Sequence, residues 1–369
     1  MLLHHLFTEE QNGIRDMIRK FVDKEIMPVR EKLEEDYALV EQVHQKLVDV
    51  GIQKAGYPEA YGGTGPGSPV ALGIICEELA RGDAGISLTA GNNAGLVRNA
   101  AMVAGNHPLF QGRGIRTTAK LEGDEWVING TKSWPSHAGL ASVYLTICNT
   151  DPSVGEEGIA LIFVPHDAPG LSFGKPEEKM GFKTSVNASV FYDNVRVPKE
   201  YRLAGPGADA QFYYATMSGT QWHSSTISLG IAQAAFDIAV EYTGTRQSGG
   251  KPVREWSLAA GILADMAIRL EMTRGAVYNY AWMMERPEAY GPPFTNEMVA
   301  KASILRSYAA DSCVWIVNKA MELMGSNGLS PEYHLEKYLR DAKITQLWLG
   351  GQQVTKYRIV RQYYDYLVA

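Results

Sequence analysis

The chain has 369 residues, of which 45% are hydrophobic, and its formal net charge is −6 at pH 7. This length leaves room for two or three domains with a sizeable core. Charges of both signs are mixed along the chain, which excludes a basic nucleic-acid-binding stripe. The sequence shows no apolar run long enough to span a bilayer and no signal peptide at its start, so we expect no membrane insertion.

The three cysteines, Cys76, Cys148 and Cys313, are an odd and scattered set. Their spacing fits neither a disulfide framework nor a zinc site. We therefore predict buried free thiols, no metal, and a reducing cytoplasmic location.

The first part of the chain is predicted to be helical. Apolar residues from Ile14 to Val22 recur at helical spacing after a Thr8-Glu9-Glu10 start signal. Further helices are expected over residues 70–80 and 88–104. These segments predict an N-terminal α-helical domain over residues 1–105.

The next part changes to short apolar runs separated by Gly, Pro and Asp, which is typical of strands. Strands are predicted over residues 126–132, 143–148, 159–164 and 189–197, with Asn129-Gly130 as a turn. This pattern predicts a middle β-domain over residues 111–205.

The last part returns to helical periodicity. Helices are predicted over residues 227–242, 256–285, 296–324 and 344–366, with a break at residues 325–328. Four helices of this length form a C-terminal four-helix bundle over residues 210–369. The fold class is thus α+β, in the order helical domain, β-domain, helical bundle.

One segment near the end, from Arg340 to Val354, carries the strongest motif. It begins Arg-Asp-Ala-Lys-Ile and has a Gln at position 353. It resembles the closing active-site motif of the acyl-CoA dehydrogenases, and the helix–β–helix order matches that family too. The resemblance implies the acyl-CoA dehydrogenase fold, the cofactor FAD and an acyl-CoA thioester as substrate.

A second motif, from Lys132 to Gly139, resembles the family's Lys-x-Trp-Ile-Thr-Asn-Gly turn. The resemblance implies that Trp134 packs on the flavin and that the Ser136 hydroxyl bonds to the flavin N5 region. The alternative is a core Trp in an ordinary β-turn. Pro135 and His137 depart from the family pattern.

The resemblance implies further residues that contact FAD or the acyl-CoA substrate. By the resemblance, Arg246 reaches the FAD diphosphate across a subunit interface, and the further cofactor contacts are Ser248, Gly325 and Gln353. Gly249 stands where the family has a Phe at the adenine end. Ser185 and Gly350 are implied substrate contacts. The alternatives are a solvated loop Arg and a turn hydroxyl.

The family's catalytic base, a Glu, is absent. Leu349 stands at its position, and a hydrocarbon side chain cannot accept a proton. Thr220 stands at the position from which a subset of the family takes its base. The backbone N–H of Leu349 remains available to polarise the thioester carbonyl.

A base elsewhere is therefore expected. Asp83 is our first candidate and His223, one helical turn from Thr220, a weaker one, with His137 in the flavin turn also considered. The alternatives are a helix-end cap for Asp83 and a satisfied core histidine for His223.

The chain also lacks the family's Thr-Glu-Pro-x-x-Gly-Ser-Asp flavin loop, because residues 106–110 run directly into residues 111–118. Two explanations of the missing loop stay open: a true deletion from the protein, or a stretch that is missing from this sequence. We favour the second, since a deletion would remove a strand and the flavin loop together.

The resemblance implies FAD-dependent dehydrogenation of an acyl-CoA, and the missing Glu predicts a relocated base and a non-linear acyl group, alicyclic or otherwise unusual. The resemblance implies a homotetramer that passes electrons to an electron-transfer flavoprotein or similar carrier. Two alternatives stay open: a flavin-dependent reductase or oxygenase of the same fold, and an inactive homologue that serves as a binding subunit.

Overall fold

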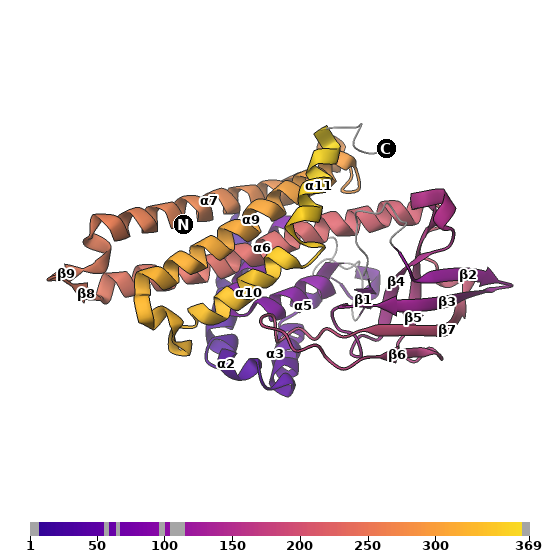
Figure 1. Cartoon of the computed structure of the whole chain (residues 1–369), viewed down its shortest axis with the longest axis horizontal. Coiled ribbons are helices and arrows are strands. Elements are labelled where there is room, and N and C mark those ends of the chain that lie inside the picture. Colours follow the sequence, from indigo (N-terminus) through magenta and orange to yellow (C-terminus); the bar gives the residue numbers. More distant parts are fainter. Residues whose placement is uncertain (1–6, 55–58, 64–66, 96–99, 104–114, 364–369) are drawn as a thin grey trace.

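The structure is a computed structural model, and it describes residues 7–54, 59–63, 67–95, 100–103 and 115–363. The middle of the chain forms a β-sheet domain at one end of the molecule, and helices from both ends of the chain lie beside it (Figure 1). Within the described residues, no helix is long and apolar enough to cross a membrane. All three cysteines are buried and free, as predicted.

The N-terminal helices pack around a core of their own. They are α1 (Glu9–Phe21), which continues into a π-helical turn (Val22–Ile26), then α2 (Arg30–Leu33), α3 (Tyr37–Asp49), α4 (Pro69–Gly82) and α5 (Ala84–Gly95). Thr8 caps α1 with its side chain, which confirms the predicted helix start. Ile18, Val22 and Leu79 are among the buried residues that join α1 to α4.

The sheet domain contains β1 (Ala100–Val103), β2 (Thr118–Glu122), β3 (Glu125–Lys132), β4 (Val143–Asn149), β5 (Ile159–Pro165), β6 (Leu171–Phe173) and β7 (Val190–Pro198). The strand order is β1-β4-β2-β3-β7-β6, and β5 lies off this path and pairs with β4 in antiparallel orientation. The four predicted strands are confirmed as β3, β4, β5 and β7. The predicted Asn129-Gly130 turn is wrong, because both residues lie within β3 at an irregularity of its pairing with β7.

The expected helix over residues 88–104 is also wrong in its second half. Helix α5 ends at Gly95, and residues 100–103 form β1, which pairs in parallel with β4. A strand is thus present just before the junction that lacks the flavin loop, which removes our reason for favouring a lost stretch of sequence. The junction itself lies in residues 104–114, outside the described residues.

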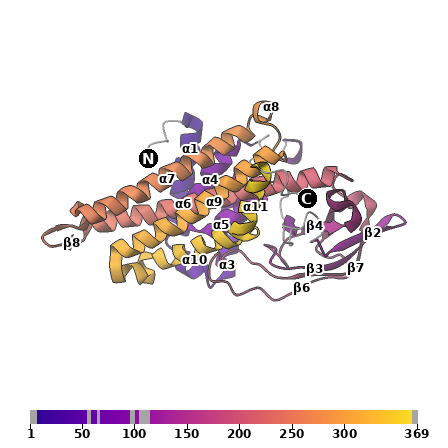
Figure 2. The same cartoon turned by 45° about the horizontal axis from the view of Figure 1, so that its top comes forward.

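The C-terminal helices are α6 (Ala208–Thr245), α7 (Ser257–Met284), the short α8 (Pro287–Tyr290), α9 (Asn296–Met324), α10 (Leu335–Leu347) and α11 (Gly351–Tyr363), with a small hairpin of β8 (Gln247–Ser248) and β9 (Lys251–Pro252) after α6. The prediction of one helix over residues 344–366 is wrong, since the chain breaks between α10 and α11. Helices α6, α7, α9 and α10 run side by side as a bundle (Figures 1 and 2).

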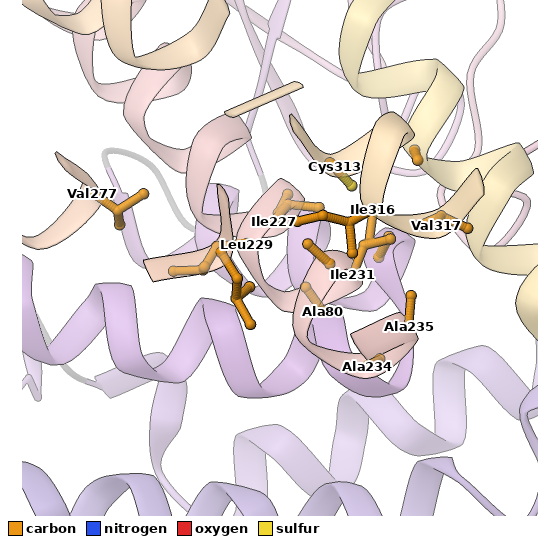
Figure 3. Close-up of a cluster of buried hydrophobic side chains, with 14 of the residues drawn as sticks. Ala80, Ile227, Leu229, Ile231, Ala234, Ala235, Val277, Cys313, Ile316 and Val317 are labelled. Atoms are coloured by element: carbon orange, nitrogen blue, oxygen red, sulfur yellow. The ribbon is translucent and has the colours of Figure 1, made fainter. Parts of the chain in front are cut away.

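Helix α6 is the centre of the molecule. Its residues Ile227 and Ile231 are fully buried against Ile316 and Val317 of α9, and Ala80 of α4 closes the other side (Figure 3). Gly230 permits this approach, because a Cβ there would lie 2.3 Å from the carbonyl oxygen of Glu77. The start of the same helix packs under the sheet, where Ala210 meets Leu161.

Candidate active site

The break between α10 and α11 forms a tight turn at the position of the missing base. Leu349, Gly350 and Gly351 all have positive φ angles, of 55°, 90° and 72°. For Leu349 this conformation is costly, because its Cβ is crowded by the backbone. Within the described part of the chain, the N–H groups of Leu349 and Gly350 donate no hydrogen bond. Two backbone donors are therefore free at this turn.

Arg306 on α9 holds this turn from beneath. Its side chain is fully buried, and Nη2 donates to the carbonyl oxygens of Thr345 at 3.2 Å and Trp348 at 2.5 Å. Nη1 donates to the Gly351 carbonyl at 3.4 Å and to the hydroxyl of Thr355. The guanidinium thus meets the carbonyl end of α10, where the helix dipole favours a cation. Burial lowers its pKa to about 10, so it stays charged at neutral pH.

The turn is joined to α6 and to the loop that precedes β7. Trp348 Nε1 donates to Ser224 Oγ at 2.7 Å, and its ring packs edge-on against Phe182 with centroids 5.2 Å apart. Thr220 lies one turn before Ser224 and therefore on the same face of α6. Its hydroxyl donates to the Thr216 carbonyl at 2.8 Å, so it is a satisfied helix hydroxyl.

His223 lies between α6 and α5. Its side chain is buried at 7% exposure, and its ring occupies the space beside Gly91, where a Cβ would lie 2.2 Å from Cε1 and Nε2. The ring hydrogen-bonds to the backbone of Ser87, while Nε2 has no partner in the described structure. Burial lowers the pKa of His223 to about 4, so the imidazole is neutral at pH 7 and Nε2 presents a lone pair.

Asp83, our first candidate base, is placed differently. Oδ1 accepts hydrogen bonds from the Ile86 N–H at 2.9 Å and the Thr184 hydroxyl at 2.5 Å, and Oδ2 accepts from Lys337 Nζ at 2.8 Å. Burial raises its pKa, but Lys337 and the hydrogen bonds outweigh this and lower it overall. A carboxylate with both oxygens occupied and a lowered pKa is a poor base, so the structure favours the alternative, a helix-end cap.

The same cluster joins all three parts of the chain. Lys337 also donates to Asp341 at 2.7 Å, and Asp341 accepts the N–H of Phe182 at 2.7 Å. Arg340 forms a two-pronged ion pair with Glu34 at 2.9 Å. The Arg-Asp start of the closing motif thus ties α10 to the N-terminal helices and to the loop before β7. Sequence reasoning missed Lys337, although its i,i+4 spacing from Asp341 was a signal.

The flavin turn follows β3. Trp134 and His137 have φ angles of 66° and 60°, and the Trp134 side chain is 54% exposed. Asn187 Nδ2 donates to the Trp134 carbonyl at 2.8 Å and to Ser136 Oγ at 3.3 Å. A half-exposed indole beside a fixed hydroxyl suits a flat ring with a polar edge, so these residues fit a flavin. The His137 N–H donates to the carbonyl of Val186, and burial lowers its imidazole pKa to about 4.

The other implied contacts lie elsewhere. Arg246 and Ser248 are exposed at the β8–β9 hairpin, which Figure 1 shows at the end of the bundle opposite the sheet. Gly325 ends α9 near them, since its neighbour Asn327 bonds to Tyr242 at 2.9 Å. The structure therefore does not bring this group together with Trp134 and Ser136 within one chain.

Of the remaining implied cofactor and substrate contacts, two are exposed at or near the α10–α11 turn and one is buried. Gln353 is exposed on α11, and Gly350 is exposed in the turn. Ser185 is buried, and its hydroxyl has no partner in the described structure.

Comparison with known proteins decides the family. Models of the acyl-CoA dehydrogenase N-terminal, middle and C-terminal domains match residues 8–109, 110–195 and 214–364. The chain belongs to the acyl-CoA dehydrogenase family. It is therefore an oxidoreductase with FAD as its cofactor, as the resemblance implied, and its fold is the family's. FAD supplies the hydride acceptor of this chemistry when it is bound.

Several relatives match over nearly the whole chain. A probable acyl-CoA dehydrogenase FadE25 of Mycobacterium tuberculosis is 31% identical over 372 residues, covering 94% of each chain. Cyclohexane-1-carbonyl-CoA dehydrogenase of Syntrophus aciditrophicus is 30% identical over 384 residues, covering 97% of each. The structure of butyryl-CoA dehydrogenase from Megasphaera elsdenii superposes with a TM-score of 0.85 at 27% identity, over 98% of this chain and 99% of that one.

Proposed function

We propose that this acyl-CoA dehydrogenase acts on a non-linear acyl group and removes its proton with a relocated base, His223. Two observations together carry the proposal: Leu349 stands at the position of the family's Glu, and the buried Nε2 of His223 has no partner in the described structure. His223 takes the place of Asp83 as the first candidate.

Imidazole basicity supports this assignment. A pKa of about 4 makes Nε2 about as basic as an ordinary carboxylate, which is the group that the family uses. The Ser87 backbone fixes the ring, so that the unpartnered nitrogen has a defined direction. The free N–H groups of Leu349 and Gly350 are suited to polarising the thioester carbonyl, which acidifies the proton to be removed.

The proposal of a non-linear acyl group is supported by the absence of the family's Glu and by the name of one relative. A base on α6 in place of one at the turn would act from a different element, and we infer that this suits a substrate of different shape. The relative from Syntrophus aciditrophicus carries cyclohexane-1-carbonyl-CoA in its name. We therefore place alicyclic acyl-CoA thioesters first among the substrates to be tested.

Two partners belong to the same proposal. A second copy of the chain is needed if Arg246 and Ser248 are to reach a flavin held at Trp134, because the β8–β9 hairpin lies at the end of the bundle opposite the sheet, whereas Trp134 follows β3 of the sheet. This supports a homo-oligomer, in the family a tetramer. An electron-transfer flavoprotein or similar carrier would then accept the electrons from the reduced cofactor.

The test is an anaerobic screen of the FAD-loaded protein against linear, branched, aromatic and alicyclic acyl-CoA thioesters, followed by the absorbance of the bound FAD. We expect an alicyclic thioester to bleach the flavin fastest. His223→Gln should keep FAD but bleach at least about 100-fold more slowly, since general base catalysis contributes that much. His166→Gln, at an exposed histidine outside the site, is the matched control and should bleach at the wild-type rate.

Three outcomes would contradict the proposal. If the flavin of the His223→Gln variant bleaches at the wild-type rate, His223 is not the base. Rapid oxygen consumption without a carrier protein would favour a reductase or oxygenase. A protein that binds no FAD, or whose flavin no thioester bleaches, would favour an inactive binding subunit.

A further inference from the structure

Three polar side chains connect the loop before β7 to the flavin turn. Lys179 Nζ donates to Asn187 Oδ1 at 2.5 Å and also to the carbonyl oxygen of Ser185. Asn187 Nδ2 donates to Ser136 Oγ and to the Trp134 carbonyl. The backbones of Ser136 and Asn187 also form an antiparallel bridge, so the two segments are aligned side by side.

The donor and acceptor roles in this chain of contacts are fixed. A lysine ammonium has three donors and no acceptor, so the oxygen of the Asn187 amide must face Lys179. The opposite amide orientation would place two donors 2.5 Å apart at Lys179 and two carbonyl oxygens 2.8 Å apart at Trp134. Both contacts therefore set the same orientation, and Nδ2 must face Ser136.

This orientation decides what the Ser136 hydroxyl can do. Because Nδ2 can only donate, Ser136 Oγ must accept, and its single proton is left free to donate in another direction. Within the described residues, that proton has no acceptor.

We propose that Lys179 and Asn187 are positioning residues that make Ser136 an obligatory hydrogen-bond donor to the bound flavin. The inference rests on FAD binding at this turn and not on the acyl group or on His223. Lys179 acts through Asn187, and Asn187 acts through Ser136, so neither residue has to touch the flavin.

Replacing Asn187 by Asp reverses the relay. A carboxylate still accepts from Lys179 but cannot donate, so the Ser136 proton turns towards it and away from the flavin. The added charge also acts on the flavin directly. Measurement in the Ser136→Ala background isolates that charge effect, because no hydroxyl is present there to be turned.

The experiment compares wild type, Ser136→Ala, Asn187→Asp and the double variant. It measures the dissociation constant of FAD from the apoprotein and the midpoint potential of bound FAD, with no acyl-CoA present. We expect Asn187→Asp to weaken FAD binding by about two- to tenfold more in the wild-type background than in the Ser136→Ala background, as for one lost hydrogen bond. The potential should move in the negative direction with the same dependence on Ser136.

Equal effects of Asn187→Asp in both backgrounds would overturn the inference, as would a wild-type protein that binds no FAD. Lys179→Met is the second variant, should Asn187→Asp fail to fold, and it should show the same dependence on Ser136 by a smaller factor. Because acyl-CoA is absent, a wrong substrate or base would leave this result unchanged.

Discussion

Lys337 on α10 lies 2.8 Å from Asp83 at the start of α5, and the two residues are 254 positions apart in the chain. Both are buried, and Asp341 shares the same ammonium at 2.7 Å. Burial of charges is unfavourable unless they are paired, so one cation between two carboxylates stabilises only the assembled arrangement of the domains.

Removing the Lys337 ammonium should therefore destabilise the fold strongly. We expect Lys337→Met to lower the free energy of unfolding by about 3–5 kcal/mol, because it leaves two buried carboxylates without a counter-ion. Urea unfolding followed by circular dichroism checks this. Lys319→Met, which removes a surface pair with Glu322 at 2.5 Å, is the control and should cost about 1 kcal/mol or less.

Asp83→Asn separates a structural role from a catalytic one. We expect a less stable protein whose folded fraction bleaches flavin at a rate near that of wild type. Rates are compared per folded, FAD-loaded molecule. A fall of about 100-fold or more at unchanged FAD content would restore Asp83 as the base.

The stabilising effect of Asp83 should depend on pH in one direction. Its pKa in the folded protein is lowered below the ordinary value near 3.8, so its contribution is present above that value and is lost as pH falls through the folded pKa. The difference in unfolding free energy between wild type and Asp83→Asn should thus hold from neutral pH to about pH 4 and narrow below. A difference that widens under acid would contradict this sign.

Leu349→Glu should add the family's chemistry at the turn. Leu and Glu carry the same backbone cost at a φ of 55°, so the substitution adds a carboxylate without further strain there. We expect the variant to bleach with butyryl-CoA, a linear thioester, faster than wild type. Leu349→Gln is the matched control, since it has the same length and no basic group, and a gain in that variant would show that polarity alone suffices.

Arg306→Lys should affect turnover more than substrate binding. Lysine keeps the charge but cannot supply the fork that reaches Trp348, Thr345 and Thr355 together. We expect kcat to fall by about tenfold or more with a smaller change in KM, because loosened N–H donors lose most in the transition state. Equal losses in both constants, or a loss explained by unfolding alone, would contradict a positioning role for Arg306.

The sequence predicted the long helices and most strands because their apolar periodicity extends over many residues. It did not predict the role of Asp83, since the partners Lys337 and Thr184 come from distant parts of the chain. The amide of Asn187 carried no local signal either, because its function depends on a turn that lies 51 residues earlier.

The break after α10 was predictable in part. Gly350-Gly351 interrupts the helical pattern, and glycines suit positive φ angles. The positive φ of Leu349 had no such signal, because leucine seldom adopts this conformation and the contacts of Arg306 on either side of it come from another helix.

The hydrogen bonds of Arg306 to this turn have a wider consequence. The path of the turn is set by two glycines and by Arg306 on another helix, which donates to backbone carbonyls and to the Thr355 hydroxyl. None of these hydrogen bonds uses the side chain at position 349. Architecture and reactivity are therefore separable at this one position. A single substitution there can exchange the chemistry of the site while the scaffold around it is unaltered, which makes the turn a point at which one fold can supply several reactions.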